Sequence, residues 1–227
     1  MSNNGATAIA IDGPAAAGKT VVGTRLAKKI GYRFLDTGMM YRAATVAALD
    51  ANADFDDVEQ LAKAVENIDI EARSGAEGDT LIFINGVDIT PRLRSHDVDS
   101  RVSVVSAIPR VREIMVDAQR KLASGGGIVM VGRDIGTVVL TNAEYKIYLT
   151  ATLETRAERR FIEMKDRPGQ PPLEDVLAVM RRRDDIDSSR EASPLRPADD
   201  AIILETDDLT VEQVVCRLTD IAKGVTS

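Results

Sequence analysis

The stretch Ile9-Ala-Ile-Asp-Gly-Pro-Ala-Ala-Ala-Gly-Lys-Thr20 runs from an apolar, strand-like segment into small residues and ends with a cation and a hydroxyl. Residues 13–20 fit the pattern G-x-x-x-x-G-K-[ST] between a predicted strand and a predicted helix, which is the context of a phosphate-binding P-loop. Small residues let backbone N–H groups surround phosphate oxygens, because bulky side chains would fill the space that a triphosphate needs. We therefore expect a nucleoside triphosphate to bind along Gly13, Pro14, Ala15, Ala16, Ala17, Gly18, Lys19, Thr20 and Val21.

Two side chains at the end of this loop have further expected roles. Lys19 would reach the β- and γ-phosphates, and the Thr20 hydroxyl would bind Mg²⁺. Asp36 ends the second predicted strand, and it either caps the next helix or orients the water shell of the metal. Asp134 likewise either caps the turn that follows it or helps to organise magnesium through water. The sequence leaves both alternatives open.

The composition narrows the class of protein. The chain has 227 residues, of which 44% are hydrophobic, and a formal net charge of −7, which suits one sizeable α/β domain and argues against general binding to nucleic acids. No apolar run is long enough to span a membrane and no secretory signal is evident, so we expect a cytoplasmic protein with no membrane partner. A monomer is a separate expectation. Cys216 is expected to be a buried, inert thiol, and His96 a structural or solvated side chain, which leaves zinc sites and His-dependent catalysis poorly supplied.

Short β-branched runs alternate with helical patterns, and this alternation is typical of a parallel sheet. Val22, Leu26 and Ile30 recur at helical spacing before Gly31, which predicts a helix after the P-loop. A final helix is predicted from Thr210, with Gln213 completing a capping box. The fold class is therefore α/β, a three-layer P-loop fold whose parallel sheet is flanked by helices. Its five strands are expected at Thr7–Asp12, Tyr32–Asp36, Ile128–Gly132, Lys146–Thr150 and Ala201–Glu205.

Two segments interrupt this alternation. In residues 68–91, the apolar residues Ile68, Ile70 and Ala72 alternate with charged residues, and the pair Asn85-Gly86 is a strong tight-turn signal. These features predict a small inserted antiparallel sheet able to move as a unit. Residues Lys165–Pro172 are rich in proline and glycine and predict a mobile turn between two helices. We expect a single domain over residues 1–227, with the insertion at 68–91 and a lid at 155–190.

Arginines are concentrated around the predicted mobile turn. They are Arg156, Arg159 and Arg160 before it, and Arg181, Arg182, Arg183 and Arg190 after it. Such clusters either form a solvated face that balances nearby carboxylates or supply cations for phosphoryl transfer, in which charge spreads over equatorial oxygens. The chain contains neither an N-K-x-D guanine motif nor an L-S-G-G-Q signature, which argues against a regulatory GTPase and an ABC-type ATPase.

Several further segments resemble the bacterial cytidylate (CMP) kinases, and the resemblance covers nearly the whole chain. The most specific are Gly132-Arg133-Asp134-Ile135-Gly136-Thr137-Val138-Val139 and the run from Arg183-Asp184 through Asp187-Ser188 to Arg190. The remaining matches include Ile11-Asp12-Gly13-Pro14, Asp36-Thr37-Gly38 with Tyr41-Arg42, Leu93-Arg94-Ser95, and Pro109-Arg110-Val111-Arg112-Glu113. The resemblance implies a P-loop kinase that transfers the γ-phosphoryl group of ATP, with Mg²⁺, to CMP or dCMP.

The resemblance also implies roles for individual residues. For the acceptor phosphate it implies Arg42, Arg133 and Arg190. For cytosine it implies Ser103, Arg112 and Asp134, together with Thr37, and for the ribose Arg183 and Asp187. The catalytic residues are expected to be Lys19, Arg133, Arg156, Arg160 and Arg190. Tyr41 is expected to pack rather than to contact substrate, and Arg110 to lie on the surface.

The chain departs from the family pattern at two positions of the P-loop. Ala16 replaces the usual glycine, and Val21 stands where a small or hydroxyl residue is common. Two alternatives to a cytidylate kinase stay open on the sequence: another nucleoside monophosphate kinase, and a non-catalytic regulator that opens and closes on ATP.

Overall fold

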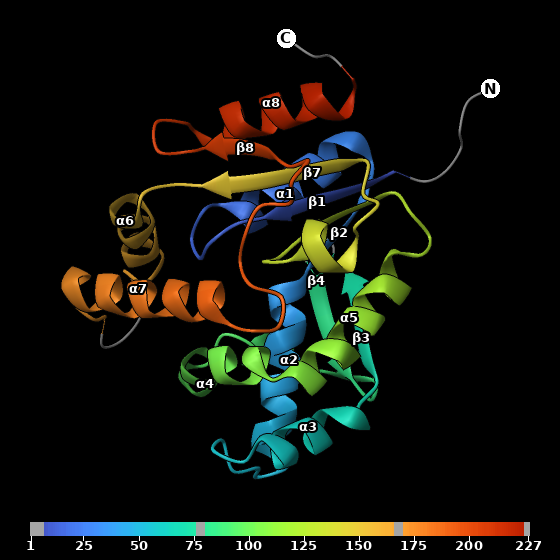
Figure 1. The fold of residues 1–227 in the computed structure, drawn as a ribbon, viewed down its shortest axis with the longest axis vertical. Helices are drawn as coiled ribbons and strands as arrows, with labels where there is room; N and C mark the ends of the chain where they lie inside the picture. Colours follow the sequence, from blue (N-terminus) through green and yellow to red (C-terminus); the bar gives the residue numbers. More distant parts are fainter. Residues whose placement is uncertain (1–6, 76–79, 166–169, 225–227) are drawn as a thin grey trace.

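The structure, a computed structural model, describes residues 7–75, 80–165 and 170–224. A parallel five-stranded sheet occupies the upper half of the molecule in Figure 1. Its strand order is β2-β6-β1-β7-β8. The strands are β1 (Ala8–Asp12), β2 (Arg33–Asp36), β6 (Ile128–Val131), β7 (Tyr145–Thr150) and β8 (Ile202–Glu205). The five predicted strands and their parallel arrangement are therefore confirmed, each to within about one residue at its ends.

Helices cover both faces of this sheet. Neighbouring residues of its central strand point to opposite faces, so each face packs against its own layer of helices. Ile9 and Ile11 of β1 are buried in one apolar cluster with α1 (Lys19–Ile30) and α8 (Val211–Ala222). Ala10 belongs to a second cluster, built with α2 (Thr37–Asp50), α4 (His96–Ala107) and α5 (Pro109–Ala123). The three layers predicted from the sequence are thus present, and the carboxyl end of β1 lies between the two layers of helices.

The helices that border the central strand begin and end as the sequence predicts. Gly31 adopts φ 75° after α1 and donates its N–H to the carbonyl of Ala27, which ends the helix. The hydroxyl of Thr210 accepts a hydrogen bond from the N–H of Gln213, whose side chain accepts from the N–H of Thr210, so the capping box at the start of α8 is confirmed.

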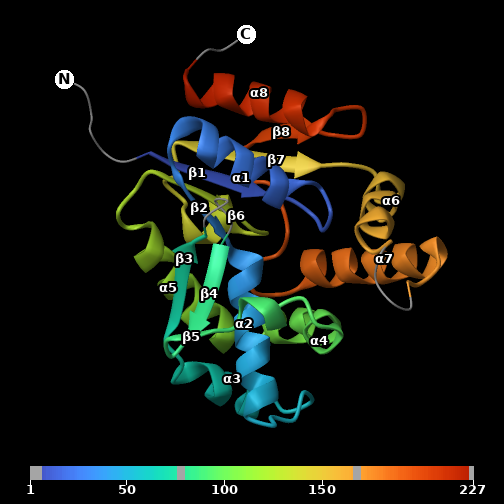
Figure 2. The same ribbon diagram turned by 180° about the vertical axis from the view of Figure 1, so that it is seen from behind.

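The insertion contains the predicted antiparallel sheet. It is made of β3 (Ile70–Ser74), β4 (Thr80–Ile84) and β5 (Val87–Asp88), and helix α3 (Val58–Glu66) precedes it. Asn85 and Gly86, at φ 50° and 79°, form the tight turn between β4 and β5. The hairpin runs beside α2 and α5 (Figure 2), and the hydroxyl of Thr80 lies 3.4 Å from the carbonyl oxygen of Phe34 in β2. The insertion therefore packs against the edge of the main sheet.

The predicted lid is a helical hairpin of α6 (Leu153–Glu163) and α7 (Leu173–Ser189) that follows β7. Part of the predicted turn at Lys165–Pro172, residues 166–169, lies outside the described residues. Ala157, Val176 and Met180 form the buried core of the hairpin, and Ala15 and Ala16 of the P-loop pack against it. The lid and the phosphate-binding loop thus share one small apolar core. The short turns η1 (Thr90–Arg92) and η2 (Ile135–Val139) complete the described elements.

One prediction about a single residue is wrong. Cys216 is exposed on α8, because the buried face of that helix is formed by Val214, Val215 and Leu218. His96 is solvated as expected, with 94% of its side chain exposed. No helix in the described parts of the chain is both long enough and apolar enough to cross a membrane.

Candidate active site

The P-loop connects β1 to α1, and its glycines satisfy steric demands that the sequence alone does not reveal. Gly13 has φ 146°, and a Cβ atom there would lie 2.0 Å from the carbonyl oxygen of Leu149. Gly18 has φ 90° and precedes the first turn of α1. Ala16 adopts φ 58°, a left-handed conformation in which glycine has no steric penalty and alanine does. The alanine that replaces the family's glycine therefore carries backbone strain as well as an extra methyl group.

Lys19 is buried inside the loop that it belongs to. Its ammonium group donates to the carbonyl oxygen of Pro14 at 2.6 Å. Burial lowers the pKa of Lys19 well below its ordinary value, and the positive charge of Arg133 lowers it further. A phosphate placed between Lys19 and Arg133 would offset both effects, so the geometry favours an anion at this point.

The Thr20 hydroxyl donates to the Oδ2 atom of Asp36 at 2.7 Å, and this contact joins the P-loop to the end of β2. The Oδ1 atom of the same carboxylate accepts the N–H of Gly38 at 2.9 Å and caps α2. The capping alternative for Asp36 is thus confirmed, and its second oxygen still lies beside the hydroxyl expected to bind the metal.

Asp134 does not cap the turn that follows it. Its carboxylate forms a buried ion pair with Arg112, whose Nη1 atom also donates to the carbonyl oxygen of Ser106 at 3.0 Å. The guanidinium of Arg112 lies over the ring of Tyr41, 5.2 Å from its centroid. Two of the residues expected to recognise cytosine, Arg112 and Asp134, are therefore brought together, and Tyr41 packs against them. Arg110 lies on the surface, paired with Glu66 and Glu113.

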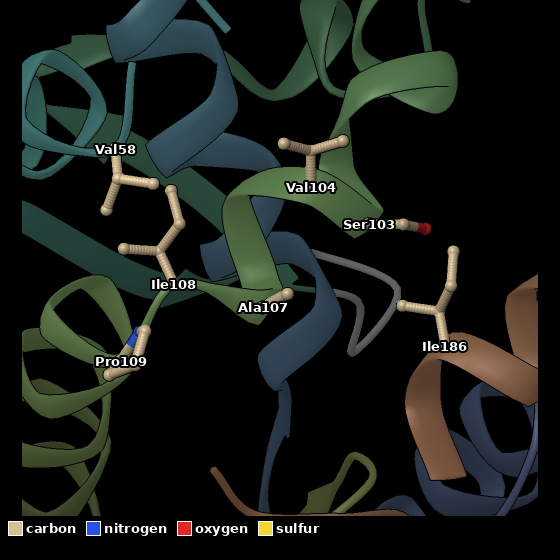
Figure 3. A pocket seen from close by; sticks show the side chains of 7 residues that line it. All are labelled: Val58, Ser103, Val104, Ala107, Ile108, Pro109 and Ile186. Carbon is tan, nitrogen blue, oxygen red and sulfur yellow. The ribbon is translucent and has the colours of Figure 1, made fainter. Parts of the chain in front are cut away.

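Thr37 and Ser103 are the other residues expected to recognise cytosine. The Thr37 hydroxyl donates to the carbonyl oxygen of Val131 at 2.9 Å. Ser103 lies on α4, at the edge of an apolar pocket of about 360 Å³, and it faces Ile186 of α7 across that pocket (Figure 3). The remaining lining residues are Val58, Val104, Ala107, Ile108 and Pro109. The pocket lies between α7 of the predicted lid and the helices α3, α4 and α5, which flank the insertion in the sequence.

A second group of charges surrounds Asp187 of α7. Arg133 donates from Nε to its Oδ2 atom at 2.9 Å, and Arg190 lies 3.7 Å from its Oδ1 atom. Burial would raise the pKa of Asp187, but the charges of Arg133 and Arg183 outweigh this effect, and the pKa lies below its ordinary value. Three predicted substrate residues therefore meet at one place: Arg133, and Asp187 and Arg190 from a segment more than fifty residues later.

Arginine side chains at this place outnumber the carboxylates that balance them. Burial and the charge of Arg133 lower the pKa of Arg183 to about 10, and Arg42 and Arg160 contribute further. Burial and the charge of Arg112 lower the pKa of Arg190 below its ordinary value. Guanidinium groups that repel each other in a buried region form a site for an anion with several charges.

Two acidic residues that the sequence did not single out hold members of the arginine group in place. Asp99 accepts from Arg42 at 2.5 Å and lies 3.6 Å from Arg160. Asp184 lies 2.7 Å from the Nη2 atom of Arg156. Asp184 belongs to the run that resembles the cytidylate kinases, and this position was the available signal for it. Asp99 lies in the first turn of α4, a position that carries no such signal in the sequence.

Arg156 joins the lid to the P-loop. Its Nε atom donates to the carbonyl oxygen of Ala151 at 3.0 Å, and its Nη1 atom to that of Ala15 at 3.3 Å. With Asp184 as a third partner, the guanidinium is buried and each of its three nitrogen atoms has a partner in the protein. The neighbouring Arg159 instead binds the hydroxyl and carbonyl groups of Thr206, and Arg181 and Arg182 are exposed.

Comparison with known proteins identifies relatives of similar sequence and a solved structure of similar fold. The sequence model described as cytidylate kinase matches residues 9–224. Curated cytidylate kinases from Bacillus cereus (strain B4264) and Bacillus thuringiensis (strain Al Hakam) are each 48% identical over 217 residues, covering 96% of this chain and 96% of theirs. A shikimate kinase structure from Bacteroides thetaiotaomicron, 14% identical with a TM-score of 0.51, covers 96% of this chain and 98% of its own and shares the fold. The chain belongs to the cytidylate kinase family.

Proposed function

We propose that this protein transfers the γ-phosphoryl group of ATP to CMP and dCMP, giving CDP or dCDP and ADP. The observation that carries the proposal is the group of arginines around Asp187, which lies beside the P-loop in a member of the cytidylate kinase family. A P-loop accounts for the donor, and an excess of buried guanidinium groups accounts for an acceptor that is itself an anion.

On the donor side, the backbone amides of residues 13–21 and the ammonium of Lys19 would hold the triphosphate. Thr20 and Asp36 suit Mg²⁺, because a hydroxyl and a carboxylate are hard oxygen ligands and already lie 2.7 Å apart. Asp134 suits the metal less well, since its carboxylate is buried against Arg112. Bound Mg²⁺ would neutralise charge that develops on the phosphates. Among the described residues no group of three or more His, Cys, Asp or Glu side chains could hold a metal alone, so phosphate oxygens would complete its coordination.

On the acceptor side, Arg42, Arg133 and Arg190 would bind the phosphate of the monophosphate, and Arg183 with Asp187 the ribose. Arg112 and Asp134, with Ser103 and Thr37, would recognise cytosine, whose amino group donates and whose N3 and O2 atoms accept hydrogen bonds. Another base would leave buried polar groups of this site without hydrogen-bond partners, so the site rejects it. Ser103 lies at the edge of the pocket in Figure 3, on the same helix as Ser106, whose carbonyl oxygen accepts a hydrogen bond from Arg112.

The acceptor phosphate is already a competent nucleophile, so the reaction needs no strong general base. Catalysis therefore rests on position and charge: Lys19, Arg133 and Arg190 hold the two phosphates, and Arg156 and Arg160 approach from the lid as charge spreads over the transferred group. The lid also excludes water, which would otherwise compete as an acceptor.

A coupled assay of ADP release with CMP, dCMP, UMP, AMP and shikimate tests this proposal. The value of kcat/KM for CMP should exceed that for AMP by roughly a hundredfold or more. If UMP or AMP were preferred, the protein would be a different monophosphate kinase. If ATP bound and no diphosphate formed, it would be a non-catalytic regulator.

Arg133→Ala provides an internal test of the acceptor site. We expect kcat/KM for CMP to fall by roughly 100-fold or more, because a half-buried donor to the transferred charge is lost, while the dissociation constant for ATP changes little. Equal weakening of CMP and ATP would contradict the placement of Arg133 in the acceptor site.

A further inference from the structure

Asp12 is a buried acidic residue that the proposed mechanism does not use. It is the last residue of β1, directly before the P-loop, and only 4% of its surface is exposed. Its Oδ1 atom accepts the N–H of Ile135 and its Oδ2 atom accepts the N–H of Gly136, both at 2.7 Å. One carboxylate therefore binds two successive backbone amides from a segment more than a hundred residues away.

The segment held by Asp12 carries two of the acceptor-site residues. Arg133 and Asp134 directly precede the two amides, which belong to the first two residues of the π-helical turn η2. The turn is closely packed on its other sides. A Cβ atom on Gly132 would lie 2.6 Å from the side chains of Ile135 and Thr37, and one on Gly136 would lie 3.2 Å from Lys146. A shift of this turn would therefore move Arg133 and Asp134 with it.

The environment of Asp12 makes a simple packing role a poor explanation. Burial raises its pKa to about 6, although the amides of Gly136 and Ile135 oppose that rise. The ionisable groups around it are Lys19, Asp134 and Tyr148, while the ammonium of Lys146 is bound to Asp200. None of the described side chains forms an ion pair with Asp12 within 4.0 Å. Burying a carboxylate that has no ion-pair partner costs folding free energy. Its two hydrogen bonds must therefore provide something that an apolar residue would not.

We propose that Asp12 is a positioning residue for phosphoryl transfer: it fixes the turn at residues 132–136 against the start of the P-loop and so places Arg133 and Asp134 relative to the donor phosphates. The inference rests on the proposed function and deepens it. Asp12 acts through the two amides and the residues before them, and it contacts no reacting atom.

Asp12→Asn is the test variant, because it keeps the shape of the side chain and one acceptor oxygen. Its amide NH₂ group would face a backbone N–H, so one of the two hydrogen bonds is lost and the turn is free to shift. A misplacement of about 1 Å is enough to lower rates by about 100-fold, so we expect kcat/KM for CMP to fall by about 10- to 100-fold. The dissociation constant for ATP, measured without CMP, should stay within about threefold, because the P-loop amides are intact.

Asp57→Asn is a matched control. Asp57 also accepts two backbone N–H groups through one carboxylate, from Glu59 and Gln60, but it caps α3 at the surface. This variant should lose a similar type of hydrogen bond and keep kcat/KM for both substrates. If both variants lowered activity equally, or if Asp12→Asn left kcat/KM for CMP within threefold of the wild type, the inference would be overturned.

An NMR measurement keeps the test independent of whether the variant folds. In the wild type, the amide protons of Ile135 and Gly136 should resonate downfield and exchange slowly, because both bind a carboxylate. Exchange as fast as in exposed turns would overturn the inference. Absence of CDP formation by the wild type would overturn the proposed function and this inference with it, whereas an active wild type with an equally active Asp12→Asn variant would overturn this inference alone.

Discussion

At Gly13 both the backbone angle and the surroundings exclude a side chain, whereas at Gly18 only the backbone angle does so. A Cβ on Gly13 would collide with the carbonyl oxygen of Leu149, and one on Gly18 would meet nothing within 4 Å. We expect Gly13→Ala to lower the free energy of unfolding by about 3 kcal/mol or more and Gly18→Ala by about 1–2 kcal/mol. Urea titrations followed by circular dichroism would measure both values, and equal losses would contradict the steric difference.

The carboxyl group of Asp12 makes stability depend on pH. Its pKa rises from 3.8 to about 6 on folding, so folding favours the protonated form. This contribution is fully present below the pKa of the unfolded chain and is lost as the pH rises through about 6. Relative to Asp12→Asn, which does not titrate, the wild type should lose about 2 kcal/mol of unfolding free energy between pH 4 and pH 7.

Denaturant titrations of both proteins at these two pH values give that difference directly, because contributions from all other groups cancel. Asp187 illustrates the opposite sign: its pKa is lowered in the folded protein, so the stability that it contributes is lost as the pH falls. A gap between wild type and Asp12→Asn that did not change with pH would argue against a buried, titrating Asp12.

Among the secondary-structure elements, those with strong local signals were predicted well. The five strands, α1 and α8 are set by apolar periodicity and by stop or cap residues such as Gly31 and Thr210. A turn after Asp134 was expected, but its attachment to Asp12 was not predicted, since the two segments lie far apart in the sequence. The error at Cys216 has a similar origin: apolar neighbours suggested burial, but only the packing of α8 shows which face is inside.

The lid hairpin is fastened to the P-loop through Arg156, and this suggests a test at the level of elements. Arg156→Lys keeps the charge but cannot maintain the contacts with Ala151, Ala15 and Asp184 at once. Because Asp184 would lose a buried partner and the lid its orientation, we expect kcat to fall about tenfold or more and the midpoint of thermal unfolding to drop.

Arg110→Lys is the control for this change, because Arg110 also pairs with two groups but lies on the surface, away from the lid. Its kcat should stay within twofold of the wild type, since exposed ion pairs contribute little. Steady-state kinetics with saturating ATP and CMP would distinguish the two variants, and unchanged kcat in Arg156→Lys would remove Arg156 from the catalytic group.

For the molecule as a whole, the excess of positive charge around Asp187 predicts a strong effect of ligands on stability. ATP or CMP at a hundred times its dissociation constant should add about 2.7 kcal/mol to the free energy of unfolding. For a chain of this size that corresponds to roughly 5–10 °C in the midpoint of thermal unfolding. Calorimetry with CMP, and with AMP at the same concentration as the control, measures the effect. Equal shifts with CMP and AMP would argue against recognition of cytosine.

The arrangement of the site as a whole could be predicted only through the family resemblance. Local pattern identifies the P-loop, because its residues are contiguous. The pairs Arg133–Asp187 and Arg112–Asp134 form only after α7 and α5 have packed, and no local pattern specifies their partners. Asp99 was missed for the same reason, since its contact with Arg42 joins α4 to α2.

The order of the main sheet has a consequence for how this enzyme family diversifies. Strands β6 and β1 are direct neighbours, about 4.8 Å apart. The backbone, and no side chain, therefore sets the spacing between the loop after β1, which receives the donor, and the loop after β6, which receives the acceptor. Changes in the inserted hairpin or in α6 and α7 would leave that spacing untouched. Chimaeras that exchange α4 and α5, which carry Ser103 and Arg112, should therefore alter which nucleotide is accepted, while the distance travelled by the phosphoryl group is inherited unchanged.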